Sequence, residues 1–249
     1  MQLRLYFHIP DKLILPLSYH HILQGFIYNV LSAEPDYSSF LHDYGYKDGE
    51  KPFKLFVFSL IDGKYEINKN TRHITFYDKI SFEVRSPMYE FCDLFCLSIM
   101  HRDRYIINDR EIFLDGCVYT KRTVMEDSIT VRTLSPICLT DNSSTDSDMK
   151  THYISPIESC FCDAVNNNFI SKYRAAHGYN PEGNIIITPE KISDKDKYVT
   201  RFLRSGKSIF ITAWNGLYNL SGSPTDLSFL YDCGIGSRNS QGFGMIEKI

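Results

Sequence analysis

The stretch QLRLYFHIPDKLILPLSYHHILQGFIYNVL, residues 2–31, contains the first strand and the first helix of a pattern that occurs twice in the chain. Gln2–Ile9 places apolar side chains at every second position, which predicts a strand that ends at Pro10. Residues 17–31 place apolar side chains three or four positions apart, which predicts an amphipathic helix. Tyr28 falls on the polar face of that helix.

The rest of the first half continues as an alternation of strands and helices. A short helix over 38–44 ends at Gly45, and a strong strand is predicted over 54–62. HITFYDK and KISFEVR predict two strands that meet around Asp78, and 88–102 predicts a second amphipathic helix. The segments 104–109 and 110–120 predict a closing hairpin. The order is β-α-β-β-α-β with extra strands.

The second half repeats this order. We expect a strand over 128–139 broken at Pro136, a solvated loop over 141–148 and a helix over 157–176. Strands over 184–192 and 198–222, a short helix over 224–231 and a last strand follow. Two such units predict an α+β protein with two tandem ferredoxin-like (RRM-like) domains. The polar stretch around 121–126 places the domain boundary between 122 and 123, giving domains 1–122 and 123–249.

Composition narrows the class of protein. The chain has 249 residues, 43% of them hydrophobic and 23% charged, which is ordinary for a globular protein of one or two domains. No apolar run reaches the ~20 residues of a membrane span, and the N-terminus does not read as a signal peptide. Seven irregularly spaced cysteines favour reduced thiols over a zinc site. We therefore expect a cytoplasmic protein without a metal or cofactor.

The end of the chain, GIGSRNSQGFGMIEKI (234–249), has four glycines within eleven residues. It is not a Rossmann fingerprint, because no helix follows it, and it lacks the G-K-[ST] ending of a Walker A loop. Two interpretations remain open. The glycines let backbone N–H groups approach a phosphate, or they form a turn that packs the last strand.

Six segments in this order carry a family resemblance: LQGFIYNVLS, FLHDYG, FKLFVFSL, LSPI, NNNFISKY and GIGSRNSQGFGMI. Together they span nearly the whole chain, and the glycine loop is the most specific of them. The chain resembles the CRISPR-associated endoribonucleases that process repeat RNA, within the repeat-associated mysterious protein (RAMP) superfamily.

The resemblance implies a reaction and a site. The substrate would be the repeat in the precursor transcript, cut without a metal ion or DNA into guide RNAs for antiviral defence. The 2′-OH would attack the adjacent phosphate and leave a 2′,3′-cyclic phosphate and a 5′-OH. The matching catalytic positions are Tyr28, His42 and Lys54, in the first domain. A CRISPR effector complex and a homodimer are both compatible partners.

These residue types suit the chemistry. A histidine can act as acid or base at neutral pH, and a lysine can stabilise charge on the phosphate. Tyr28 can donate a hydrogen bond or position His42. Each of the three also fits a role without catalysis: Tyr28 as an aromatic at the edge of the core, His42 as a solvated histidine at a helix end, and Lys54 as a surface lysine. His21, seven residues before Tyr28 on the same helix, is the competing histidine, with His20 beside it.

RNA binding is predicted in the second domain. The stretch 191–207 contains six basic and two acidic residues, and within it Arg201 and Arg204 are the main candidates for phosphate contacts. Lys172 and Arg174 are further candidates, and Trp214 or Tyr218 could stack on a base. In the glycine loop, the predicted RNA contacts are Gly236, Ser237, Arg238, Asn239, Gly242 and Gly244.

Two other functions fit the same residues less well. A non-catalytic RNA-binding subunit of a CRISPR effector complex would keep the fold and the glycine loop without needing His42. An unrelated enzyme of ferredoxin-like fold would need another motif, since fold does not determine function.

Overall fold

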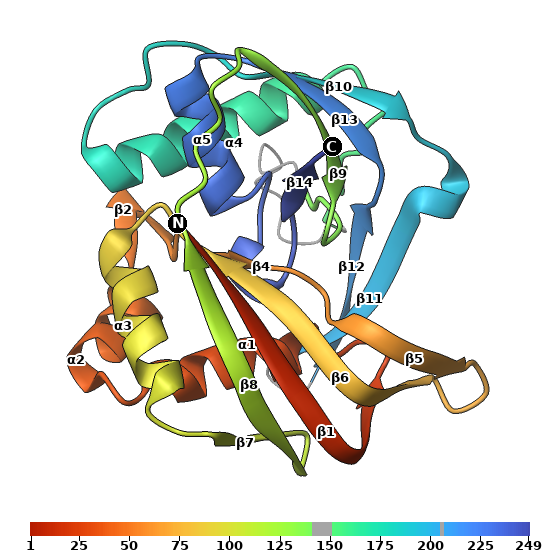
Figure 1. Cartoon of the computed structure of the whole chain (residues 1–249). Coiled ribbons are helices and arrows are strands. Elements are labelled where there is room, and N and C mark those ends of the chain that lie inside the picture. Colours follow the sequence, from red (N-terminus) through yellow and green to blue (C-terminus); the bar gives the residue numbers. More distant parts are fainter. Residues whose placement is uncertain (141–150, 205–206) are drawn as a thin grey trace.

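The first half of the chain forms a ferredoxin-like unit (Figure 1). The computed structural model describes residues 1–140, 151–204 and 207–249, without the side chains of 203, 204 and 207; the predicted loop 141–148 lies outside them. The sheet has the order β4-β6-β1-β8, in which all neighbours are antiparallel. Its elements are β1 (Gln2–Pro16), α1 (His20–Leu31), β4 (Val57–Phe58), β6 (His73–Arg85), α3 (Tyr89–Met100) and β8 (Arg110–Thr120).

Further elements extend this unit. Strand β7 (Arg104–Ile107) pairs with β8, and β5 (Asp62–Asn68) pairs with β6. After α1 come α2 (Pro35–Ser39), a π-helical turn (Phe40–Tyr44) and a small hairpin of β2 (Tyr46–Asp48) with β3 (Lys51–Phe53). This insertion carries one of the predicted catalytic residues.

The second half has the same strand order, β10-β13-β9-β14. Its elements are β9 (Ser128–Thr133), α4 (Phe161–His177), β10 (Ile186–Lys191), β13 (Leu217–Ser221), α5 (Pro224–Cys233) and β14 (Ile246–Lys248). The long hairpin of β11 (Lys197–Arg204) and β12 (Lys207–Trp214) reaches from this unit toward the first (Figure 1). The tandem ferredoxin-like fold is therefore confirmed, while the boundary at 122/123 stays a prediction within the segment from Thr120 to Ser128.

Three local predictions were wrong. Strand β1 continues through Pro10 to Pro16, with a register shift between His8 and Lys12 that absorbs the proline. Strand β6 is continuous through Asp78, whose positive φ of 59° bends the strand without ending it. Of the stretch 54–62, only β4 and Asp62, the first residue of β5, lie in the sheet, because Leu55 has a φ of 50° and the β2–β3 hairpin before it packs against α4 of the second domain.

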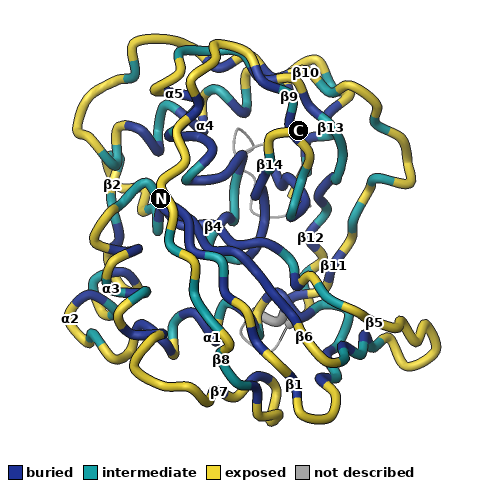
Figure 2. Tube along the Cα trace, in the orientation of Figure 1, coloured by how far each residue is buried: buried dark blue, intermediate teal, exposed yellow. Residues whose placement is uncertain are grey.

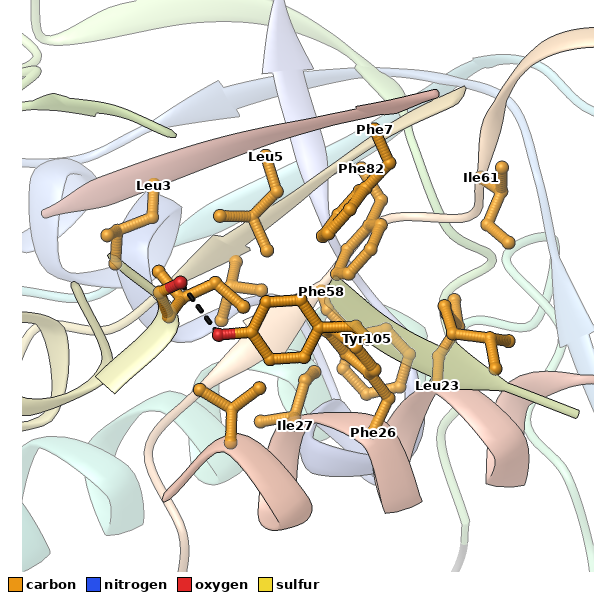
Figure 3. Packing of buried hydrophobic residues seen from close by; sticks show 14 of the residues in the cluster. Leu3, Leu5, Phe7, Leu23, Phe26, Ile27, Phe58, Ile61, Phe82 and Tyr105 are labelled. Carbon is orange, nitrogen blue, oxygen red and sulfur yellow. Dashed lines mark hydrogen bonds between the residues drawn. The ribbon is translucent and has the colours of Figure 1, made fainter. Parts of the chain in front are cut away.

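Each sheet buries its own core. In the first, alternate β1 residues meet the apolar face of α1, and Phe7 lies against Phe26 and Phe82 with ring centroids 5.9 Å apart in both pairs (Figure 3). The Tyr105 hydroxyl donates to the Ile99 carbonyl at 2.7 Å. Figure 2 shows buried residues along β4 and the adjoining part of β6, and exposed residues in the β5–β6 turn.

A buried arginine joins the two domains. Arg85, at the end of β6, has a fully buried side chain that pairs with Glu83 and donates to the Ile246 carbonyl of β14 at 2.6 Å. Its guanidinium also lies 4.1 Å from the ring centroid of Tyr231 in α5. The relative position of the two sheets is thus held by a specific polar contact, in addition to apolar packing. Among the described helices, none is long and apolar enough to cross a membrane.

Candidate active site and RNA-binding surface

Tyr28, His42 and Lys54 come together from three segments. Tyr28 lies on α1, His42 in the π-helical turn and Lys54 just after β3. The rings of Tyr28 and His42 meet edge to face with centroids 6.0 Å apart, and the Lys54 ammonium donates to the His42 carbonyl at 2.7 Å. The structure therefore brings together the three residues predicted from the sequence.

Gly45 makes this cluster possible. It ends the π-helical turn with a φ of +65°, and a Cβ on it would lie 2.6 Å from the Phe53 carbonyl oxygen. Only a residue without a side chain lets the backbone before Lys54 approach the turn this closely. The glycine in FLHDYG thus has a direct structural role: it brings Lys54 within reach of the turn that carries His42.

Asp43 is a member of the cluster that the sequence reasoning missed. The imidazole Nδ1 of His42 is 2.7 Å from an Asp43 carboxylate oxygen. Because a carboxylate accepts hydrogen bonds, Nδ1 carries the proton and donates, and Nε2 is left as the acceptor in the neutral ring. The dipeptide His42–Asp43 was visible in the sequence, but adjacent residues on a regular helix point in different directions.

Burial shifts the pKa values of Tyr28 and Lys54. It raises the pKa of Tyr28 to about 12, so its hydroxyl stays protonated at neutral pH and serves as a hydrogen-bond donor. Burial also lowers the pKa of Lys54 below its usual value, and the Asp43 carboxylate opposes that change. His42 itself is mostly exposed, which leaves its ring open to a substrate.

The two competing histidines have other positions. His20 is fully buried: its Nδ1 donates to the Gln241 carbonyl at 3.2 Å, and the Tyr198 hydroxyl donates to its Nε2 at 3.0 Å. Burial lowers the pKa of His20 to about 4, so it is neutral at pH 7. His21 is exposed, with Nδ1 2.9 Å from the Ser18 carbonyl, and lines a separate cavity of about 250 Å³ with Arg201. Neither is in the Tyr28–His42–Lys54 cluster.

The glycine loop is a tight backbone crossing. Gly242 and Gly244 are buried, and their N–H groups donate to the Asn239 and Pro136 carbonyls at 2.9 and 2.8 Å. A Cβ on Gly244 would lie 1.9 Å from the Ile235 carbonyl oxygen. The Asn239 amide donates to Ile235 and Phe243 carbonyls and holds the loop from inside.

Ser237, Arg238, Ser240 and Gln241 are the half-exposed residues of the loop. Arg238 has a φ of 61°, and its side chain donates to the Gln241 side chain at 3.1 Å. Ser237 and Arg238, with buried Gly236, line a cavity of about 280 Å³ whose other wall is the segment around Lys54. Lys54, from the Tyr28–His42–Lys54 cluster, and the glycine loop thus line one cavity, although they belong to different domains.

The other predicted RNA contacts are separated. Arg201 is exposed on the β11–β12 hairpin, where it donates to Ser208 Oγ at 2.8 Å, and the side chain of Arg204 lies outside the described residues. Arg174 makes two hydrogen bonds to Asp48 of the first domain, at 2.9 and 2.6 Å. Lys172 is buried and donates to the Gly234 carbonyl at 2.8 Å.

The two aromatic candidates for base stacking are both buried. Trp214 is 7% exposed and Tyr218 is fully buried, so both belong to the protein interior. The described residues bring no three histidine, cysteine or acidic side chains into a metal-binding group, and all seven cysteines are free.

Comparisons with known proteins agree with this architecture. Residues 14–117 match the family "CRISPR-associated protein Cas6, N-terminal", and residues 120–248 match "CRISPR associated protein Cas6, C-terminal". A CRISPR-associated endoribonuclease Cas6 of Methanocaldococcus jannaschii is 25% identical over 250 residues, covering 100% of this chain and 93% of that protein. One from Pyrococcus furiosus is 27% identical over 234 residues, covering 93% and 83%.

Solved structures show the same likeness. A CRISPR-associated protein Cas6 is 25% identical with a TM-score of 0.78, covering 100% of this chain and 99% of that one. A Cas6-related protein from Pyrococcus furiosus, 21% identical with a TM-score of 0.81, has the same fold over 100% and 98% of the two chains.

Fold and site together define a tandem ferredoxin-like protein, with the Tyr28–His42–Lys54 cluster on one domain and a glycine-rich loop on the other. The chain belongs to the Cas6 family of CRISPR-associated proteins. The expected enzyme class is confirmed, because its curated relatives are endoribonucleases.

Proposed function

We propose that this chain cuts the repeats of a CRISPR precursor transcript without a metal ion, and so releases guide RNAs. The observation that carries the proposal is the meeting of Tyr28, His42 and Lys54, of which Lys54 also lines a basic cavity together with the glycine loop. The three residues come from separate segments, and each supplies a group that RNA transesterification needs.

His42 is the general base in this proposal. Asp43 holds the proton on Nδ1, so Nε2 faces outward and takes the proton from the 2′-OH. The 2′-oxygen then bonds to the adjacent phosphorus as the bond to the 5′-oxygen breaks. A proton passes to that 5′-oxygen, and the products carry a 2′,3′-cyclic phosphate and a 5′-OH.

Lys54 and Tyr28 support the same step. The Lys54 ammonium is anchored by the His42 carbonyl and stabilises the negative charge that develops on the phosphate oxygens. The Tyr28 hydroxyl, which stays protonated, donates a hydrogen bond to the substrate and fixes the edge of the imidazole ring. A positively charged group within a partly buried site acts more strongly than it would in water.

RNA binding would continue onto the second domain. We propose that Ser237 and Arg238 contact the backbone next to the cut, and that Arg201 and Arg204 on the hairpin contact it farther away. The site of action would be the cytoplasm, since the substrate is an intracellular transcript. Hand-over of the product to an effector complex and pairing of two copies are both compatible with this arrangement.

The test uses end-labelled CRISPR repeat RNA in excess EDTA. We expect a single cut by the wild-type chain, a rate ~10²–10⁴-fold lower for His42→Ala, and nearly unchanged RNA affinity. His21→Ala is the matched control and should cut normally. If His42→Ala cuts normally and His21→Ala does not, the assignment is wrong. Binding without any cut by the wild type would instead indicate a non-catalytic RNA-binding subunit.

A further inference from the structure

We infer that the cavity of about 280 Å³ between the domains holds one whole nucleotide next to the scissile phosphate, and that Asn168 contacts its base. This inference rests on the proposed function. Lys54 places the cavity beside the catalytic cluster, because it lines the cavity and also donates to the His42 carbonyl. The occupant would therefore flank the bond that is cut.

The charge of the cavity suits a phosphate. Four cationic side chains line it, Lys51 and Lys54 from the first domain and Lys172 and Arg238 from the second. Among the described residues that line it, none is acidic. A cluster of like charges around a concave surface, without counter-ions, favours binding of an anion.

Lys172 is the most unusual of these cations. Its side chain is buried in α4, and its ammonium donates to the Gly234 carbonyl at 2.8 Å. Burial is the main cause that lowers the pKa of Lys172 to about 8; the Cys233 side chain opposes this change and repulsion from Lys51 adds to it. A phosphate in the cavity would supply the missing opposite charge and accept the remaining ammonium hydrogens.

Asn168 indicates that a base enters as well. It lies one helical turn before Lys172 on α4, is only 9% exposed and also lines the cavity. Its Oδ1 accepts no hydrogen bond from the described residues. A half-turn of the amide exchanges its oxygen and nitrogen, so a ligand can meet either one. The base edges of single-stranded RNA all carry hydrogen-bond donors and acceptors, so Asn168 would detect the presence of a base and not its identity.

The size of the cavity limits the occupant. About 280 Å³ lies just below the ~300–1,000 Å³ typical of small-molecule sites and far above the ~30 Å³ of a water molecule. One nucleotide fits this range better than a stacked run of bases. We therefore expect the cavity to hold a single unstacked nucleotide.

The first experiment measures affinity for repeat RNA blocked by a 2′-deoxy nucleotide at the cleavage position. Removing the base on one side of the scissile phosphate should weaken wild-type binding about 10-fold, the effect of one hydrogen bond to a buried partner. In Asn168→Leu the intact RNA should bind that much more weakly, and removing the base should have no further effect. Asn167→Leu, an exposed neighbour on the same helix, is the control and should behave as wild type.

The second experiment requires neither RNA cleavage nor a substitution of the buried Asn168. Free AMP should bind the wild type about 10-fold more tightly than ribose 5-phosphate, which lacks a base. Lys51→Met should weaken AMP binding several-fold, whereas Lys47→Met, exposed on the same hairpin and away from the cavity, should not. Equal binding of AMP and ribose 5-phosphate, or equal behaviour of the two lysine variants, overturns the inference.

The outcomes separate this inference from the proposed function. If the wild type cuts repeat RNA but Asn168→Leu matches Asn167→Leu in the base-removal experiment, the nucleotide pocket is wrong and the enzyme stands. If the wild type cuts no repeat RNA but binds AMP more tightly than ribose 5-phosphate, and Lys51→Met weakens AMP binding, the proposed function is wrong and the pocket stands.

Discussion

Replacing Arg85 with alanine should destabilise the whole chain, because it removes a buried polar contact between the two domains. The side chain is 1% exposed, and its partner Glu83 is 6% exposed. Without the guanidinium, a buried carboxylate has no opposite charge and the Ile246 carbonyl loses its donor. Leaving one partner of a buried pair alone costs about 3–5 kcal/mol.

Urea denaturation and thermal melting measure this effect. For a chain of this size, about 4 kcal/mol corresponds to a melting temperature lower by roughly 8–16 °C. Arg4→Ala is the matched control, because Arg4 and Asp62 form an exposed pair at 3.7 Å. Exposed pairs contribute at most about 1 kcal/mol, so this variant should melt within a few degrees of the wild type.

A double variant separates pairing from packing. In Glu83→Gln with Arg85→Met, neither charge remains, so most of the stability lost in Arg85→Ala should return. The reasoning is refuted if Arg85→Ala loses less than about 1 kcal/mol. It is also refuted if the double variant loses as much unfolding free energy as Glu83→Gln and Arg85→Met lose when their separate losses are added. The two charges would then act independently.

Three further predictions follow from the loop, the buried histidine and the hairpin. Gly244→Ala should destabilise the chain by more than about 2 kcal/mol in urea denaturation, because at a φ of +81° the added Cβ would clash with the Ile235 carbonyl oxygen. Gly25→Ala is the control: its Cβ would lie in open space on α1, so it should stabilise the chain by about 0.5–1 kcal/mol. The pKa of His20 is about 4 when folded and ~6.5 when unfolded, so unfolding takes up a proton as pH falls between these values. Stability should therefore fall by about 3 kcal/mol from pH 6.5 to 4, and this part of the pH dependence should vanish in His20→Asn. Arg201→Glu with Arg204→Glu should weaken repeat RNA binding and lower the slope of log K against log[salt] by about 2; unchanged affinity removes the hairpin from the site.

The sequence predicted the order of elements well but not where some strands end. Alternation and helical spacing located β1, α1, α3 and α4, because each buries one regular face. They failed at Pro10 and Asp78, where a bulge lets a strand continue past a residue that usually ends it. Such bulges depend on the neighbouring strand, which local sequence does not specify.

The candidate site was predictable only in part. The family resemblance named Tyr28, His42 and Lys54, and the structure brings them together. Asp43 was missed because a π-helical turn changes the directions of adjacent side chains. Asn168 was missed because it read as one polar residue in NNNFISKY, and only the packing of α4 against the first domain shows it at the cavity.

The identical strand order of the two sheets has a consequence for how such a protein can evolve. The first helix after the first strand is α1 in one unit and α4 in the other, so Tyr28 and Asn168 occupy corresponding helices. If the chain arose by gene duplication, both copies kept a role in the proposed site, because the corresponding helix of each contributes a different residue to it. Exchanging one half for that of a distant relative would then keep both folds and still mismatch the cavity walls.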